Sequence, residues 1–445
     1  MTGAKGDGLH PQVVPGEILL PLGEWSNEDS WSLVESSMKR VQKSIVPDVR
    51  RINRSTILRQ IYLGQSMSRQ KLSQHSGLSS ATVTNVVVEL IQEGIVIESG
   101  IEASEGGRPR SILTINPHHG YFIGVDIGET FLRVELFDLT LHKLGCVTYP
   151  QVLGENQPDQ VGQYISQGVK ATSAEVGISA EKVIGIGIGV GGLVEQAEQV
   201  FTYVPSWEWQ RIPLVTFLEK DLHMPIYLDN AAKVMAQAEN LFGAGQWCEH
   251  LAVLLVGTGI GAGIITHDSL YRGASNNAGE WGHMTIALDG RLCRCGSCGC
   301  LEAYAGASGI IARLREVAPQ SSLLQSNDQE RVIADIVEAA RNGDLAAIGV
   351  LLDTARYLGA GIANLINLFN PQVIVLGGWV GLEIGEYILP ELRQFVAHYA
   401  LKQSFSATKI ELSHLGHDAV AMGAAALALE QFLAAAGRHS SYSLG

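Results

Sequence analysis

The first part of the chain combines helical periodicity with turn signals. Apolar side chains recur at helical spacing in two stretches, first at Ile57, Leu58, Ile61 and Tyr62 and then at Val83, Val86, Val87, Leu90 and Ile91. Between them, Ser68 is placed to cap a short helix that Gly77 ends, and Ser79 is placed to cap the helix that Gly94 ends. The pattern therefore predicts three helices in this part of the chain.

Two apolar runs of strand character follow these helices, over residues 95–98 and 111–115. A polar loop, residues 99–110, separates them. Three helices followed by a two-stranded wing predict a winged helix-turn-helix over residues 51–116.

From Gly120 onward, apolar strand-like runs alternate with helical patterns. Strands are expected over residues 121–127, 131–139, 183–190, 251–255, 261–265 and 373–376, and helices over residues 157–175, 231–241, 329–342 and 345–368. Strand–helix alternation is typical of an α/β fold. Glycine-rich turns near Asp126 and Gly257 indicate two similar lobes around a cleft.

These patterns divide the chain into four parts. They are a largely flexible extension over residues 1–50, with a short helix near 31–38, the winged module over 51–116, a first lobe over 117–230 that also takes a C-terminal helix at about 418–435, and a second lobe over 231–417.

Composition and charge refine this picture. Apolar residues make up 46% of the 445 residues, which favours a mostly globular protein, and the net charge is −14. Residues 39–110 nevertheless carry a charge of +5, which favours an anionic partner for this module. Six cysteines, mostly clustered, no visible signal peptide and no expected membrane-spanning stretch predict a cytoplasmic protein with no membrane partner.

The cysteines themselves form a metal-binding pattern. Cys293, Cys295, Cys298 and Cys300 fall within eight residues, and His283 precedes them by ten. His283 with Cys293, Cys295 and Cys300 would complete a tetrahedral zinc site, leaving Cys298 as the spare thiol. Because four protein ligands leave no open position, the zinc is expected to be structural. The alternative is a set of free buried thiols beside an ordinary core histidine.

The winged module offers side chains that suit DNA. Polar residues lie opposite the apolar stripe of the third helix, at Ser80, Thr82, Thr84 and Asn85. A recognition helix presents such positions to base edges in the major groove. Arg69 and Lys71 can contact phosphates, and Arg108 and Arg110 in the wing can enter a minor groove. The alternative is a helical module that docks another protein.

Glycine-rich turns in the body leave nucleotide binding open. Asp126 and Gly128 follow one strand, and Gly257, Thr258 and Gly259 follow another. Such turns let backbone N–H groups approach phosphate. Glu129, however, places a carboxylate beside the first turn, and like charges repel, which argues against ATP as a ligand.

Over about residues 51–435 the chain resembles the ROK family of sugar kinases and sugar-responsive repressors. The most specific match is Glu280-Trp281-Gly282-His283 followed by the loop from Cys293 to Glu302. The resemblance implies a two-lobed, actin-like (ribonuclease-H-like) body that binds zinc through a His and three Cys. It also implies sugar contacts at Asn230, Glu280, His283 and Glu302, with Gly191 in a loop beside the sugar, residues 185–192. The family's repressor branch adds an N-terminal winged helix, and Gly107-Arg108-Pro109 is similar to that branch's linker.

One departure from the family's kinases separates the two branches. The kinases carry a general-base Asp directly after the cleft Asn, eight residues before a helix Glu. Here that Glu corresponds to Glu239, and the base position is Ala231. Asp229 lies two residues earlier, which turns its side chain by roughly 200° on a helix. Ser206 stands where the kinases tend to place an Asn near the sugar.

These observations predict a sugar-responsive DNA-binding transcriptional regulator rather than an enzyme. Operator DNA and a sugar or sugar-phosphate effector are the expected partners, and the protein is expected to form a homodimer or homotetramer, because palindromic operators match symmetric oligomers. The alternative is an ATP-dependent sugar kinase of the same family with an added DNA-binding domain. Asp126 and the turn at 257–263 support this alternative.

Overall fold

The computed structural model describes residues 49–64, 66–102, 110–151, 156–196 and 199–438. The predictions for residues 1–48, including the flexible extension and the helix near 31–38, lie outside the described residues. So does Arg108, together with its neighbours Gly107 and Pro109.

The N-terminal module contains three helices and a small antiparallel sheet, as predicted. Its elements are a helix over residues 49–64, β1 (Met67–Ser68), α2 (Arg69–Ser76), α3 (Ser80–Gln92), β2 (Val96–Glu102) and β3 (Arg110–Ile115). The hydroxyls of Ser68 and Ser79 cap α2 and α3, and Gly77 ends α2 with a φ of 68°. β1, which the pattern did not indicate, pairs with β3, so the sheet has the order β1-β3-β2.

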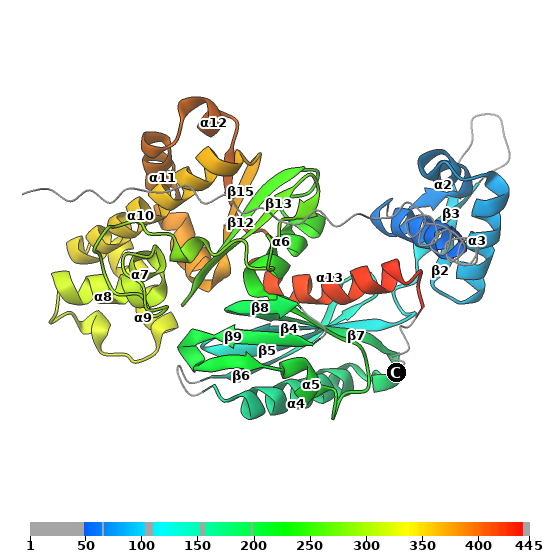
Figure 1. The fold of residues 1–445 in the computed structure, drawn as a ribbon, viewed down its shortest axis with the longest axis horizontal. Helices are drawn as coiled ribbons and strands as arrows, with labels where there is room; N and C mark the ends of the chain where they lie inside the picture. The colour runs from blue at the N-terminus through cyan, green and yellow to red at the C-terminus, as the bar shows by residue number, and fades with distance from the viewer. Residues whose placement is uncertain (1–48, 65, 103–109, 152–155, 197–198, 439–445) are drawn as a thin grey trace, which may run out of the picture. The chain divides into compact units, whose positions relative to one another are not determined.

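The first lobe is built on a five-stranded sheet of order β11-β7-β4-β5-β6 (Figure 1). Its elements are β4 (Tyr121–Ile127), β5 (Phe131–Asp138), β6 (Lys143–Pro150), α4 (Pro158–Val176), β7 (Val183–Val190), β8 (Leu193–Gln196), β9 (Val200–Val204), β10 (Trp209–Ile212), α5 (Leu214–Leu218) and β11 (Ile226–Asn230). Strands β8, β9 and β10 form a separate antiparallel sheet. The run of buried side chains along β4 and β7 matches strands that are covered on both faces.

The second lobe repeats this topology in the sheet β14-β13-β12-β15-β16. Its elements are α6 (Ala231–Phe242), β12 (His250–Val256), β13 (Ile260–Thr266), β14 (Ser269–Leu270), α7 (Glu302–Ala305), α8 (Ala307–Val317), α9 (Gln329–Arg341), α10 (Leu345–Phe369), β15 (Val373–Gly377), α11 (Gly378–Tyr399), α12 (Lys402–Ser406) and β16 (Lys409–Leu412). In each sheet a central strand, β4 or β12, pairs antiparallel on one side and parallel on the other. The prediction of two similar lobes in an α/β fold is thereby confirmed.

Two helices, α6 and α13 (Ala419–Ala434), join the lobes (Figure 1). Helix α13 packs on β4 and β7 of the first sheet, α6 packs on β12 and β13 of the second, and the two helices pack on each other. The backbone of α13 closely approaches the backbones of β7 and α6 at glycines. A Cβ added at Gly187 of β7 would lie 1.7 Å from the carbonyl oxygen of Ala424, and one at Gly423 would lie 1.9 Å from that of Val234. The alternating glycines of β7 are therefore required for the close packing of α13 on this strand.

The N-terminal module shares a hydrophobic core with the C-terminal end of α13. Leu58, Ile61 and Val87 belong to the same buried cluster as Phe432 and Leu433. Polar contacts reinforce it, because the buried Arg54 donates to the carbonyl oxygen of Ala436 at 2.7 Å and to a carboxylate oxygen of Glu93 at 2.8 Å. The winged module therefore packs directly against the helix that joins the two lobes.

Helix α10 is the exception to the expected lack of a membrane-length segment. Among the described residues, it is long and apolar enough to cross a membrane by length and composition. Half of its apolar window is buried, and its side chains belong to the core of the second lobe. Its hydrophobicity is that of a core helix packed between α9 and α11.

We expect the Gly187→Ala variant to lose at least about 3 kcal/mol of unfolding free energy, because its methyl group would overlap the backbone of α13. Chemical denaturation measures the loss. Gly349→Ala is the matched control, because an added Cβ in this part of α10 meets nothing within 4 Å. It should be neutral or stabilise by up to about 1 kcal/mol, and equal stability of the two variants would contradict this account of β7.

Candidate functional site

A cleft that encloses about 1220 Å³, including the part open to solvent, is lined by residues of both lobes. All the residues expected to contact sugar line it, namely Gly191, Asn230, Glu280, His283 and Glu302. So do all those considered for nucleotide, namely Asp126, Gly128, Gly257, Thr258 and Gly259. These ten residues come from six separate segments of the sequence and meet around one cavity.

The glycine-rich run 185–192 is only partly a loop at the cleft. Residues through Val190 belong to β7, where Gly187 packs against α13, and only Gly191 and Gly192 line the cavity. The strand expected over residues 183–190 is thereby confirmed, and the likeness of the run to the family's loop beside the sugar reaches the cleft only at Gly191 and Gly192. Alternation along the strand turns its glycines toward the neighbouring helix.

Asn230 is held by the start of α6. Its side-chain oxygen caps the helix by accepting from the N–H groups of Ala232 and Lys233, and its Nδ2 donates to the carbonyl oxygen of Gly192 at 2.8 Å. These contacts hold the amide at the N-terminal end of α6 and link it to the loop after β7. The next residue, Ala231, faces the cleft with a methyl group.

Asp229 is turned away from this cavity. Its side chain is 2% exposed, pairs with Arg272 and lies beside Asn276. Arg272 and Asn276 both follow β14 in the second lobe, so Asp229 takes part in a contact between lobes. A carboxylate held in this way is not available to a ligand hydroxyl.

The carboxylates of the cleft sit in an environment that disfavours charge. Burial raises the pKa of Asp126 to about 7, against a weaker opposing effect of Arg133. Burial likewise raises the pKa of Glu280 to about 7, although nearby Lys233 acts in the opposite direction. The pKa of Glu129 is also raised by burial, which outweighs the effect of Arg294.

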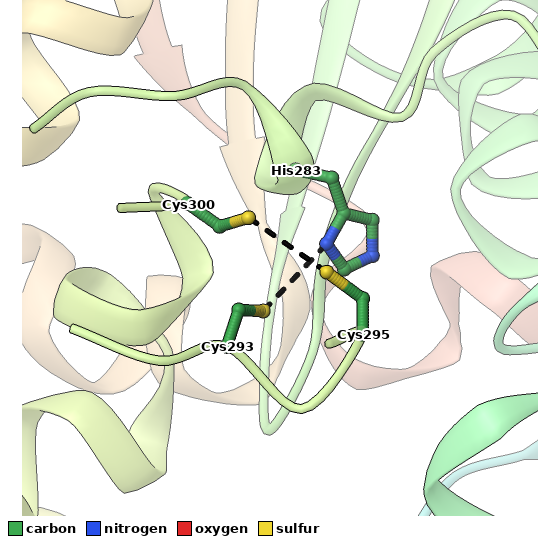
Figure 2. A group of neighbouring side chains, drawn as sticks. All are labelled: His283, Cys293, Cys295 and Cys300. Atoms are coloured by element: carbon green, nitrogen blue, oxygen red, sulfur yellow. Dashed lines mark hydrogen bonds between the residues drawn. The ribbon is translucent and has the colours of Figure 1, made fainter. Parts of the chain in front are cut away.

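His283, Cys293, Cys295 and Cys300 form the expected cluster at one side of the cleft (Figure 2). Their ligand atoms all lie within 4.8 Å of one another. The sulfurs of Cys295 and Cys300 are 3.8 Å apart, and Nδ1 of His283 is 3.8 Å from the sulfur of Cys293. Cys298 is exposed and is not part of the cluster.

This geometry fits zinc. Zn–S bonds of about 2.3 Å at tetrahedral angles place two sulfurs about 3.8 Å apart, which is the separation of Cys295 and Cys300. Burial, together with the nearby Cys295 and Glu302, raises the pKa of the Cys293 thiol to about 12, so a thiolate at this position requires a compensating cation. The second ring nitrogen of His283 points away from the sulfurs (Figure 2). One imidazole can therefore contact a metal through Nδ1 and a ligand in the cleft through Nε2.

Arg294, between two cysteines of the cluster, was missed by the sequence analysis. Its guanidinium lies 2.6 Å from a carboxylate oxygen of Glu129 in the first lobe, and its Nε donates to Glu302 at 2.8 Å. The signal that could have revealed it is the Cys-Arg-Cys spacing, because a residue between two ligands of one ion is held rigidly. Nothing in the sequence indicated that its partner would come from the other lobe.

Comparison with known proteins identifies the family. The ROK family model matches residues 122–431, which is more than half of the chain. The chain belongs to the ROK family.

Relatives of this ROK protein match it well beyond the family model. The xylose repressor of Caldicellulosiruptor bescii is 31% identical over 393 residues, covering 86% of this chain and 97% of the relative. The DNA-binding transcriptional dual regulator NagC of Escherichia coli K12 is 30% identical over 383 residues, covering 85% of this chain and 92% of the relative. A crystal structure of a ROK family transcriptional regulator, a homologue of the E. coli MLC protein, superimposes with a TM-score of 0.73 at 28% identity, covering 87% and 98%. This ROK protein is therefore of the transcriptional-repressor type.

The winged module of this ROK protein exposes the side chains expected to read DNA. Ser80, Thr84 and Asn85 are exposed on α3, whereas Thr82 is half-buried and its hydroxyl lies 2.9 Å from that of Ser79 at the cap. Arg69 of α2 pairs with Glu98 of the wing at 2.9 Å, and Lys71 lies on the exposed side of α2. Arg110 is the first residue of β3, and Arg108 lies outside the described residues.

The raised pKa of Asp126 predicts that the unfolding free energy of this ROK protein depends on pH. Its folded-state pKa of about 7 exceeds the value of 3.8 for an ordinary Asp, so the stability that the neutral form provides is lost as pH rises toward 7. Between pH 5 and pH 8 we expect the parent protein to lose about 3 kcal/mol more unfolding free energy than Asp126→Asn. Denaturation curves at both pH values measure this, and parallel pH dependences would contradict it.

Proposed function

We propose that this protein is a sugar-responsive transcriptional repressor that binds operator DNA through the winged module. The observation that carries the proposal is the course of α13. Its first residues, Ala419 and Val420, line the cleft, and near its other end the carbonyl oxygen of Leu433 accepts from Ser55 of the winged module. Just beyond the helix, the carbonyl oxygen of Ala436 accepts from Arg54. One helix of 16 residues, about 24 Å long, thus connects the ligand cavity to the DNA-binding module.

The cleft has the chemistry of a sugar site. The carboxylates of Glu280 and Glu302 offer acceptors to hydroxyl groups, and Nε2–H of His283 offers a donor when Nδ1 binds the metal. The rings of Trp207 and Trp379 also line the cavity. The named relatives support a sugar effector, because one is a xylose repressor. We infer that a sugar in this cleft biases the arrangement of the lobes and, through α13, the operator affinity of the winged module.

We infer further that the protein has no kinase activity. A general base must come within about 3 Å of the hydroxyl that it deprotonates. Ala231 stands where the base is expected and has no proton acceptor, and the carboxylate of Asp229 is engaged by Arg272. The relatives named as repressors agree with this inference.

Zinc in this proposal is structural. His283, Cys293, Cys295 and Cys300 would hold it, and a bound Zn²⁺ would supply folding free energy to the loop while leaving no open coordination position. The loop carries Glu280 before it and Glu302 after it, so closing the loop fixes both carboxylates at the cleft. The protein is proposed to act in the cytoplasm as a two-fold symmetric homodimer or homotetramer, matched to a palindromic operator.

The first test is operator binding in the presence of sugars. We expect the protein to bind DNA from upstream of its own gene, with an affinity that falls as salt increases, and we expect one sugar to change that affinity. Asn85→Ala should weaken operator binding by about 1–3 kcal/mol, because the amide is exposed on α3. Fluorescence anisotropy with labelled DNA measures both effects.

Gln92→Ala is the matched control, because Gln92 is exposed at the C-terminal end of the same helix. It should bind operator like the parent, and both variants should keep the thermal shift caused by sugar. Phosphorylated sugar formed from ATP by the parent protein would favour the kinase alternative and contradict the proposal. Insensitivity of operator binding to every sugar tested would also count against it.

The second test is metal content. We expect one zinc per chain in the parent and close to none in His283→Ala, with a lower melting temperature because the loop loses its metal. Cys298→Ser serves as the control, since Cys298 is exposed outside the cluster. Elemental analysis and thermal melting measure the two effects. Equal zinc content in parent and His283→Ala would contradict the assignment.

A further inference from the structure

We infer that this cleft selects neutral sugars over their phosphate esters, and that Glu129 sets this preference by neutralising Arg294. The inference rests on the proposed sugar-binding function and narrows its ligand class.

Arg294 is the only Lys or Arg side chain among the residues that line the described cleft. It would be the natural partner of a phosphate, because a guanidinium binds oxyanions through paired donors. One donor of each of its two edges is already engaged, because Nη1 lies 2.6 Å from Glu129 and Nε lies 2.8 Å from Glu302. Neither edge therefore offers a free pair of donors.

The two acids that hold Arg294 are well shielded. The side chains of Glu129 and Glu302 are 13% and 7% exposed, and that of Arg294 is 34% exposed. Glu302 also accepts from the N–H of Ile260 at 2.9 Å, which holds its carboxylate in place. A phosphate ester could bind Arg294 through paired donors only by displacing a buried carboxylate, which would then be left without its cation.

The remaining charges of the cleft also oppose a phosphate. Four carboxylates line the cavity, at Asp126, Glu129, Glu280 and Glu302. The ionisable side chains there besides these and Arg294 are the imidazoles of His283 and His417 and the thiol of Cys295. A phosphate monoester adds about −1.5 to −2 charges near neutral pH. Burial already raises the pKa values of Asp126 and Glu129, so the cavity disfavours even the negative charge that it contains. Neutral hydroxyl groups, by contrast, can donate to these carboxylates.

The backbone site that could have received a phosphate is also covered. A Cβ at Gly259 would lie 2.7 Å from Nη2 of Arg294, and one at Gly257 would lie 3.2 Å from the ring of Trp379. The second glycine turn is therefore occupied by side chains of its own lobe. At the first turn, Glu129 itself stands directly after Gly128. Side chains thus crowd the second turn, and a carboxylate that would repel an oxyanion adjoins the first.

Isothermal titration calorimetry with paired ligands tests this inference. The probes are D-xylose, D-glucose and N-acetylglucosamine, each beside its own phosphate ester, namely xylose 5-phosphate, glucose 6-phosphate and N-acetylglucosamine 6-phosphate. In the parent, we expect the sugar that binds to do so at least tenfold more tightly than its ester. In Glu129→Gln, which keeps the shape but frees Arg294, we expect that ratio to fall at least tenfold, chiefly through a gain in affinity for the ester.

Glu330→Gln is the matched control. Glu330 accepts a hydrogen bond from Thr130 across the lobes at 2.7 Å, yet it lies outside the set that lines the cleft. The Glu330→Gln substitution removes the same unit of charge without freeing Arg294. Its ratio of sugar affinity to ester affinity should therefore equal that of the parent. Melting curves of both variants verify that they are folded before the titrations are compared.

The outcomes separate this inference from the proposed function. A parent protein that prefers a phosphate ester would overturn the inference and leave sugar sensing intact. An unchanged ratio in Glu129→Gln, or an equal fall in Glu330→Gln, would overturn the role of the Glu129–Arg294 pair. If the parent binds none of the six compounds, sugar sensing itself is contradicted and the inference is overturned with it.

Discussion

Closure of the loop from His283 to Cys300 is the constraint on which the cleft depends. The four ligands come together over a short stretch, and isolated bridges between Thr285 and Cys300 and between Leu292 and Cys298 fold the loop back on itself. Every charged group of the second lobe that lines the cavity either belongs to this loop or adjoins it. Without that closure, Arg294 and Glu302 would have no fixed relation to each other or to the first lobe.

Polar contacts hold the two lobes in register, and one of them comes from this loop. Arg294 reaches Glu129 across the cleft, Glu330 accepts from Thr130, and Arg272 pairs with Asp229. The contact between α6 and α13, by contrast, is close and brings backbones together. A tightly packed hinge with polar contacts between the lobes is suited to lobe movement, because exchanging ion pairs for ligand contacts costs little compared with separating packed backbones.

The chemistry of the cavity also shows how a kinase-like fold can serve as a sensor. The cavity keeps acceptors for hydroxyl groups but has no base for phosphoryl transfer. Ala231 offers only a methyl group, Asp229 is held in a buried ion pair, and side chains cover the second glycine turn. Binding energy that a kinase would use in the transition state is then available to shift an equilibrium between lobe arrangements. Helix α13 provides the physical connection to the winged module, since one end lines the cavity and the other accepts a hydrogen bond from Ser55.

The sequence by itself determined the elements with strong local signals. The serine caps and Gly77 marked α2 and α3, buried apolar runs marked β4 and β7, and the spacing of His283 and the cysteines identified the metal cluster. It failed where the local signal was weak or misleading. The edge strand β6 is largely exposed and α11 contains Pro390, so neither was expected. Only the tertiary structure decided that Glu129 faces Arg294, that Arg272 pairs with Asp229 and that Arg54 bonds to Ala436, just beyond α13. These pairs join residues 43 to 382 positions apart. Side-chain contacts at such separation depend on how the sheets and helices pack, which no local pattern encodes.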